Sequence, residues 1–83
     1  MLHELKTWPE YFQSIRTGAK KFEIRKNDRG FKTGDILRLR EYIPGEDRYT
    51  GEVIIAAVSY IVQGSWGLPD DVCVMSLIFP EVQ

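Results

Sequence analysis

The longest apolar run in this sequence of 83 residues is Val53-Ile54-Ile55-Ala56-Ala57-Val58-Ser59-Tyr60-Ile61-Val62. It predicts a long strand that is apolar on both faces, which is typical of a strand at the centre of a sheet or bent around a barrel. Ser59 interrupts the run, and its length is about half of the roughly 20 residues that a membrane-spanning helix requires. We therefore expect this strand to be the scaffold of the fold, and we predict no membrane span.

Shorter segments on either side show the two-residue period of strands. In residues 20–25, Phe22 and Ile24 alternate with charged residues, which predicts a strand with one buried apolar face and one polar face. Residues 36–42 repeat this pattern with basic residues on the polar face, and residues 72–79 predict a last, mostly apolar strand. Polar, glycine-rich or proline-containing turns separate these strands, at residues 26–30, 33–35, 43–48 and 63–70.

One helix is predicted before these strands, over residues 8–17. Thr7 is a suitable N-cap, Pro9 stands in the first turn, and Glu10 follows Thr7 by three positions, which together form a capping-box signature. Gly18 can adopt the left-handed conformation that closes a helix. The spacing of four apolar residues places them on one side of the helix, which we assign to the core: Trp8, Tyr11, Phe12 and Ile15.

These elements amount to one early helix followed by about five strands, in a single domain that spans residues 1–83. The composition, with 43% hydrophobic and 28% charged residues, is that of a globular domain and not of a disordered or fibrous segment. The chain is too short for a two-sheet sandwich, and one helix cannot cover an open sheet. The expected fold is therefore mainly β with one helix (α+β), a small, partly closed β-barrel that the helix plugs.

Charge is distributed unevenly along the chain, although the total is only −1. Residues 16–40 hold nine of the eleven bases against three acids, a net charge of +6, and the remainder of the chain carries −7. If these bases gather on one face, their field would attract phosphates. The alternative is that they are ordinary solvated surface charges. The nine bases are Arg16, Lys20, Lys21, Arg25, Lys26, Arg29, Lys32, Arg38 and Arg40.

Cysteine and histidine each occur once. The lone Cys73 excludes an intrachain disulfide and a multi-cysteine zinc site, and its apolar strand predicts a packed core residue rather than a nucleophile. His3 lacks the partner pattern of a metal site or a catalytic triad. The first residues lack the basic segment and long apolar stretch of a secretory signal. We therefore predict no metal, no cofactor and a reducing, cytoplasmic setting.

The densest group of charged residues lies at the junction of the helix and the next strand, in Gly18–Arg25. Lys21, Glu23 and Arg25 are two positions apart and share one strand face, and Lys20 lies where the chain changes direction. A carboxylate between cations can accept hydrogen bonds from a base amino group while the cations hold phosphate. The alternative is a ladder of surface ion pairs, each worth only about 0 to 1 kcal/mol.

The same residues resemble a family signature. Gly18, Lys20, Glu23 and Arg25 match the G-x-K-x-x-E-x-R pattern of the ASCH domain (activating signal cointegrator homology). Nearly the whole chain looks like a compact ASCH-like subfamily of uncharacterised bacterial and phage proteins. The further matching segments are His3-Glu4-Leu5-Lys6 with Trp8, Phe22 to Arg29, the turn Gly34-Asp35 before Ile36-Leu37, and the Gly67-Leu68 loop before Val74-Met75-Ser76.

The resemblance implies a PUA-like β-barrel with a cleft near the signature, in a superfamily whose PUA members bind RNA. It also implies an alternative, because some small ASCH proteins resemble amidohydrolases that act on N4-acetylcytidine with a catalytic lysine, threonine and glutamate. Lys20 matches that lysine, but Glu23 occupies the threonine position, which removes the nucleophile. Such an enzyme would have to use Lys20 as the base and Glu23 to activate water. We therefore favour a binding module over an enzyme.

The expected function is binding of RNA or a nucleotide-like ligand in the cleft at the signature. Trp66, in a glycine-rich loop, either stacks on a base or forms a lid over one end of the barrel, with the lid slightly favoured. A protein partner is a third alternative, and the sequence does not distinguish a monomer from a dimer. The candidate binding residues are Lys20, Lys21, Glu23, Arg25, Lys26, Asn27, Arg29, Arg38 and Trp66, with His3 and Lys6 as secondary candidates.

Overall fold

A computed structural model describes residues 1–79 of the chain. One of its five strands precedes the helix, which the sequence did not predict, and the other four lie where strands were expected. The central strand is longer than expected, because it begins at Arg48. The elements run in the order β1 (Leu2–Thr7), α1 (Pro9–Arg16), β2 (Phe22–Lys26), β3 (Ile36–Ile43), β4 (Arg48–Gln63) and β5 (Val72–Ile78).

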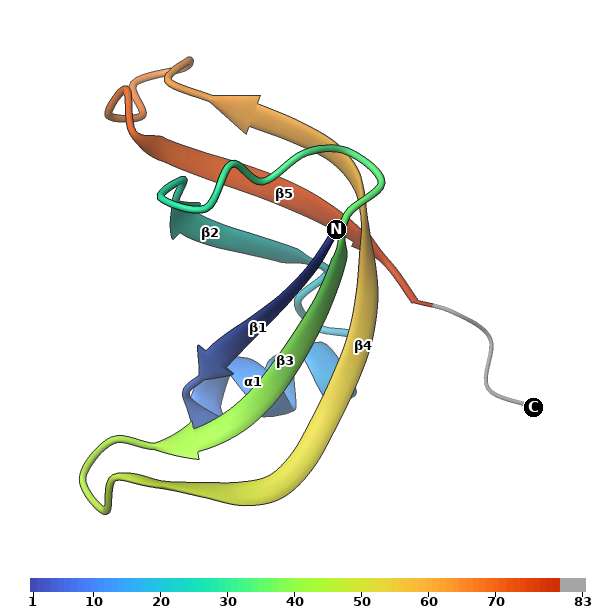
Figure 1. The fold of residues 1–83 in the computed structure, drawn as a ribbon, viewed down its shortest axis with the longest axis vertical. Coiled ribbons are helices and arrows are strands. Elements are labelled where there is room, and N and C mark those ends of the chain that lie inside the picture. The colour runs from blue at the N-terminus through green and yellow to red at the C-terminus, as the bar shows by residue number, and fades with distance from the viewer. Residues whose placement is uncertain (80–83) are drawn as a thin grey trace.

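All five strands belong to one sheet in the order β1-β3-β4-β5-β2. β1 pairs in parallel with β3, and the other neighbours are antiparallel. β4 pairs with β3 from Arg48 to Ala57 and with β5 from Ala57 to Gln63, so both halves of the sheet share it. A register shift interrupts each pairing, and the sheet curls along β4 into a half-barrel (Figure 1). The prediction of a central, bent strand is confirmed.

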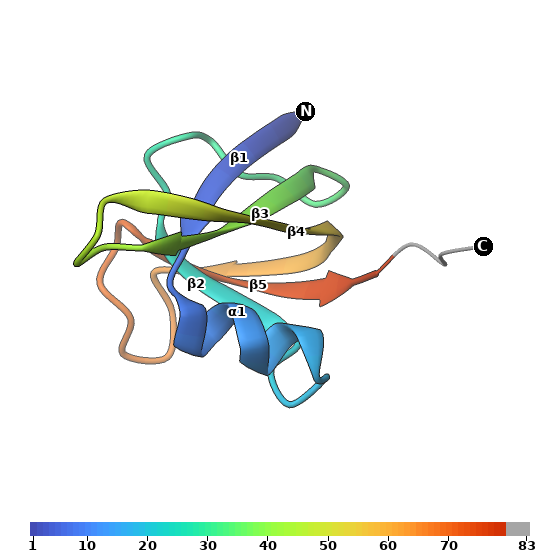
Figure 2. The same ribbon diagram turned by 90° about the horizontal axis from the view of Figure 1, so that it is seen from below.

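The core lies on the inner face of this curled sheet, and α1 crosses one end of it (Figure 2). Phe12 and Ile15 of α1 are buried there. Because α1 lies on the inner side, it leaves outward side chains of β4, such as Ile55 and Tyr60, exposed. Phe31, between β2 and β3, also belongs to the core. The remaining core residues are inward-pointing residues of the strands: Leu5, Leu37, Leu39, Ala56, Val58, Cys73, Met75 and Leu77.

The first strand, β1, has a polarity that conceals it in the sequence. Its inward side chains are His3, Leu5 and Thr7, and its outward ones include the apolar Leu2. Two of the three buried positions are therefore polar, and an alternation of apolar and polar residues does not mark the strand. Its backbone register with β3 pairs Leu2 with Ile36 at one end and Thr7 with Glu41 at the other.

The predicted N-terminus of the helix is wrong in one respect. Thr7 is the last residue of β1, and the N-cap is Trp8, which has extended backbone angles and makes no capping hydrogen bond through its side chain. Because Trp8 precedes the helix, helical spacing does not place it on the buried stripe with Phe12 and Ile15. Trp8 and Tyr11 are about half-exposed, so their assignment to the core is also wrong.

Asp35 connects the start of β1 with the turn before β3. Its Oδ2 lies 2.8 Å from Nε2 of His3 and accepts a hydrogen bond from the backbone N–H of Lys32 at 3.0 Å. The Met1 amino group donates to Oδ1. The hydrogen bond with His3 is the main reason why the pKa of Asp35 falls from 3.8 to about 2, although burial acts in the opposite direction. His3, a secondary candidate for ligand binding, is thus a buried partner of Asp35.

This shift predicts a pH-dependent contribution of Asp35 to stability. A carboxyl group whose pKa is lower in the folded state stabilises the fold at pH values above its unfolded pKa, and this contribution disappears as the pH falls through the folded pKa. The wild-type protein should therefore be more stable than Asp35→Asn above pH 3.8, and the difference should shrink as the pH approaches 2. Urea unfolding followed by circular dichroism at several pH values measures it. A difference that is constant over this range would contradict the assignment.

Candidate functional site

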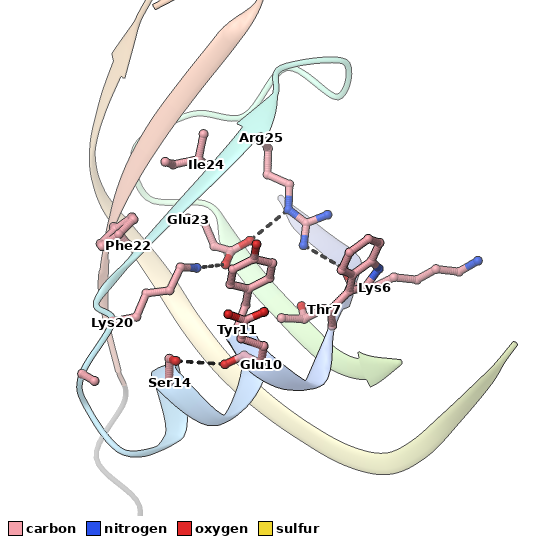
Figure 3. Close-up of a pocket in the computed structure, with 12 residues that line it drawn as sticks. Lys6, Thr7, Glu10, Tyr11, Ser14, Lys20, Phe22, Glu23, Ile24 and Arg25 are labelled. Carbon is pink, nitrogen blue, oxygen red and sulfur yellow. Dashed lines mark hydrogen bonds and ion pairs between the residues drawn. The ribbon is translucent and has the colours of Figure 1, made fainter. Parts of the chain in front are cut away.

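β2 directs the charged side chains of Glu23 and Arg25 inward and its apolar side chains outward, which is the reverse of the prediction. Glu23 is 3% exposed, whereas Phe22 and Ile24 are 41% and 53% exposed. Figure 3 shows Phe22 and Ile24 on one side of the strand and Glu23 and Arg25 on the other. A two-residue period defines two faces but not which of them points inward. The inward face is occupied by charge here because each charged group finds a partner.

Both carboxylate oxygens of Glu23 accept a hydrogen bond from a cation. The Lys20 ammonium donates to Oε1 at 2.7 Å, and Nε of Arg25 donates to Oε2 at 2.9 Å. The Lys20 Nζ also lies 5.1 Å from the ring centre of Phe22 and 5.4 Å from that of Tyr11. Burial of a carboxylate is costly unless it is paired and hydrogen-bonded, and this arrangement supplies both. The structure therefore brings Lys20, Glu23 and Arg25 together.

Arginine side chains connect the two edge strands, β1 and β2. The Met1 carbonyl accepts a hydrogen bond from Ile36 of β3. Since carbonyl directions alternate along a strand, the carbonyls of Glu4 and Lys6 point to the opposite, free edge. Arg25 Nη2 donates to the Lys6 carbonyl at 2.8 Å, and Arg29 Nη1 donates to the Glu4 carbonyl at 2.7 Å. The guanidinium groups of Arg25 and Arg29 thus donate hydrogen bonds to two backbone carbonyls that, inside a sheet, would bond to a neighbouring strand.

A hollow of about 740 Å³ lies between α1, the end of β1 and β2 (Figure 3). This volume is within the range of small-molecule sites, roughly 300 to 1,000 Å³. The hollow combines the buried carboxylate and its two cations with aromatic rings and hydroxyl groups. Its lining residues are Lys6, Thr7, Trp8, Glu10, Tyr11, Ser14, Ala19, Lys20, Phe22, Glu23, Ile24 and Arg25.

Only some of the predicted binding residues meet at this hollow. Lys20, Glu23, Arg25 and the secondary candidate Lys6 belong to its lining. Arg29 lies next to it, against the free edge of β1. The remaining basic candidates lie elsewhere: Lys21 and Lys26 are exposed outside the lining, and Arg38 pairs with Glu4 on the outer face of the sheet.

The two candidates that are not basic have other positions. Asn27 holds the turn after β2, because its amide donates to Gln63 Oε1 and its Oδ1 accepts from the backbone N–H of Phe31, both at 2.7 Å. Trp66 lies in the loop between β4 and β5 and is 94% exposed. A side chain this exposed covers nothing, so the prediction that it forms a lid is wrong.

The sequence reasoning missed the aromatic and hydroxyl side of the hollow. Trp8 stands at the corner between β1 and α1, and Tyr11 and Ser14 are three positions apart on the helix side that faces β2. Recognising β1 would have revealed Trp8 alone, because a strand that ends at Thr7 moves Trp8 out of the helix. Tyr11 keeps its helical spacing with Ile15, so the sequence pattern does not separate it from the buried Phe12 and Ile15.

Within residues 1–79, no three side chains of His, Cys, Asp or Glu gather closely enough to hold a metal ion. Over the same residues, no helix has both the length and the apolar character needed to cross a membrane. Cys73 is buried in the core, and burial raises the pKa of its thiol.

Residues 2–77 match a protein family described as "Domain of unknown function (DUF3850)". The chain belongs to this family. The match includes every residue that lines the hollow of this DUF3850 protein. A relative in Escherichia phage P2, named "Uncharacterized 12.9 kDa protein in GpA 3'region", is 35% identical over 69 residues. The aligned region covers 83% of this chain and 62% of the phage protein, so the chain spans less than two thirds of that relative.

The buried position of Glu23 predicts a large effect of its substitution on stability. Glu23→Gln removes the charge that two cations share and should lower the free energy of unfolding by about 1 to 3 kcal/mol. Glu52→Gln is the matched control, since Glu52 pairs with Arg16 at the same 2.7 Å but both side chains are exposed. An exposed pair contributes about 0 to 1 kcal/mol. Equal losses in urea unfolding of the two variants would contradict the structural role of Glu23.

The Cys73 thiol should be unreactive in the folded protein. The thiolate is the reactive form, and burial both raises the pKa of this thiol and blocks access to it. We expect a disulfide reagent such as 5,5'-dithiobis(2-nitrobenzoic acid) to react rapidly at pH 8 in urea and far more slowly without urea. Equally rapid reaction of the folded protein would show that β5 is not packed as described.

Proposed function

We propose that this DUF3850 protein is a PUA-like, ASCH-related module of the cytoplasm that binds RNA, through a nucleotide unit held in the hollow beside Lys20, Glu23 and Arg25. The signature shared with ASCH domains and the curled five-stranded sheet support the PUA-like assignment. The observation that carries the binding proposal is the composition of the hollow. Exposed aromatic rings, a buried carboxylate and two cations line one space of about 740 Å³.

The pairing within the hollow leaves capacity for a ligand. Each Glu23 oxygen can accept a further hydrogen bond, for instance from a base amino group. Lys20 has three N–H donors and Arg25 has five, and the structure uses one of Lys20 and two of Arg25 for hydrogen bonds. The remaining donors can hold phosphate, and the rings of Trp8 and Tyr11 can stack on a base. The three classes of contact that single-stranded RNA requires therefore meet at one place.

An amidohydrolase acting on an acylated nucleoside such as N4-acetylcytidine is the second candidate. The observation that favours it is the presence of two aliphatic hydroxyl groups in the lining of the hollow, from Thr7 and Ser14, although Glu23 occupies the expected threonine position. Both hydroxyls donate to backbone carbonyls, and Lys20 donates to Glu23, whereas a nucleophile needs a base that accepts its proton. The geometry therefore favours binding. Deacetylation of N4-acetylcytidine by the purified protein, abolished in Ser14→Ala or Thr7→Val, would reverse this preference.

Substitution of Tyr11 tests the binding proposal without removing the ion pairs that support the fold. Tyr11→Ala should weaken binding of a short single-stranded RNA by about 1 to 3 kcal/mol, roughly 5- to 150-fold, because a stacking surface is lost. Tyr60→Ala is the matched control, since Tyr60 is an exposed tyrosine on the outer face of β4. Binding is measured by fluorescence anisotropy, and the contact region by NMR chemical-shift changes.

Two results would overturn the proposal. One is the absence of RNA binding by the wild-type protein at low salt, where contacts with phosphate are strongest. The other is an equal effect of Tyr11→Ala and Tyr60→Ala, which would place the binding surface away from the hollow. Chemical-shift changes at residues 6–11 and 20–25 that weaken with added salt are the expected result.

A further inference from the structure

We infer that the outer face of β1, β3 and the first half of β4 carries the continuation of the bound strand, so that the ligand is a single-stranded polynucleotide rather than an isolated nucleotide. This inference rests on the proposed function and adds a second surface to it. The surface, called the outer track below, consists of Glu4, Lys6, Arg38, Arg40, Tyr42 and Tyr49.

The outer track is built by the register of the strands. β1 and β3 pair Glu4 with Arg38 and Lys6 with Arg40, and their side chains point away from the core. Arg38 Nη1 donates to Glu4 at 2.9 Å, and Arg40 Nη1 donates to the other oxygen of the same carboxylate at 3.5 Å. The cations are thus held in a row by the sheet and by one shared acid.

Aromatic rings alternate with these cations. The Arg40 guanidinium lies 3.8 Å from the ring centre of Tyr49, and the Lys6 ammonium lies 4.5 Å from that of Tyr42. The two rings pack edge to face with their centres 5.2 Å apart. Cations interleaved with exposed rings are typical of surfaces that track a single strand, because phosphates pair with the cations and bases stack on rings or on guanidinium planes.

The charge of the outer track complements a polyanion. Three cations, Lys6, Arg38 and Arg40, share the outer track with one acid, Glu4, whose carboxylate pairs with Arg38 and Arg40. The acids at the adjoining hairpin tip already have partners, since Glu46 pairs with Arg48 of the tip and Asp47 accepts a hydrogen bond from the Tyr42 hydroxyl of the outer track. Arginine also suits phosphate better than a point charge does, because its planar fork can bind two oxygens. An acidic peptide would satisfy the cations but would leave the rings without a role.

Lys6 makes the outer track continuous with the hollow. Its side chain belongs to the lining of the hollow and lies over Tyr42 of the outer track. In Figure 3 the Lys6 side chain extends away from Glu23, and it is exposed. The Lys6 backbone carbonyl accepts a hydrogen bond from Arg25. Arg25, a cation of the hollow, is therefore in direct contact with Lys6, a cation of the outer track. A strand with one base in the hollow would therefore cross the edge of β1 onto β3.

The experiment compares two ligands, cytidine 5'-monophosphate and a short single-stranded RNA of mixed sequence, on the same variants. Arg40→Ala and Tyr49→Ala should weaken RNA binding roughly five- to tenfold and leave binding of the mononucleotide unchanged. For Arg40→Ala, the slope of log K against log salt concentration should also become shallower by about 0.7, the value for one lost phosphate contact. Arg16→Ala is the matched control, because Arg16 is an exposed arginine on α1 that pairs with Glu52.

A gain of affinity provides an independent test. Glu4→Gln removes the one acid of the outer track and frees Arg38 and Arg40 from it, so it should strengthen RNA binding and steepen its salt dependence. A role of Glu4 in folding alone would not produce this gain. A duplex of the same sequence should bind more weakly than the single strand, since its bases are already stacked on each other.

The outcomes separate this inference from the proposal on which it rests. If the wild-type protein binds neither ligand, both the proposed function and the inference about the outer track are overturned. If it binds both, and Arg40→Ala, Tyr49→Ala and Glu4→Gln leave RNA affinity and salt slope unchanged, the outer track alone is overturned. Equal affinity for duplex and single strand would also overturn it. Loss of RNA affinity with unchanged mononucleotide binding supports both.

Discussion

The fold depends on how the two edges of a curled sheet are closed. β1 and β2 stand at opposite ends of the strand order, and a free edge exposes backbone groups that require partners. Arg25 and Arg29 supply them by donating to the carbonyls of Lys6 and Glu4. Arg25 can do so because Glu23 holds its Nε, and Glu23 can be buried because Lys20 and Arg25 neutralise it. One network therefore closes the half-barrel and buries a carboxylate.

The same network forms a wall of the hollow, so the proposed recognition would use side chains that also hold the fold together. The ion pairs hold Lys20 and Arg25 in place, which would lower the entropy lost on the proposed binding. The cost is that substitution of either residue changes stability as well as affinity, and a loss of binding in such variants would be ambiguous. Tyr11, Arg40 and Tyr49 lie on the proposed binding surfaces but take no part in the network that closes the sheet edge. Substitutions at these positions therefore test binding separately from stability.

The sequence predicted those parts of the fold in which the buried side chains are apolar and the exposed ones are polar. The β4 scaffold, the inward Leu37 and Leu39 of β3 and the buried Cys73 of β5 all follow the rule that apolar side chains point inward. The failures occur where buried polar groups find specific partners. His3 is buried because of Asp35, which is distant in sequence. Glu23 is buried because of Lys20 and Arg25, which are near in sequence but do not reveal which face of β2 points inward. Hence β1 was missed and the faces of β2 were reversed.

The candidate site was predictable to a similar extent. The signature located Lys20, Glu23 and Arg25, since local spacing suffices to bring residues of one strand and its preceding turn together. The high density of bases in residues 16–40 did not reveal which of them lie at the sheet edge and which on the outer face, because strand register sets these positions. Arg25 and Arg29 turn toward the edge of β1, whereas Arg38 and Arg40 project from the outer face of β3 toward Glu4. Counting bases along a sequence gives the number of cations in a domain, and only the sheet decides which of them close its edge and which lie on its outer face.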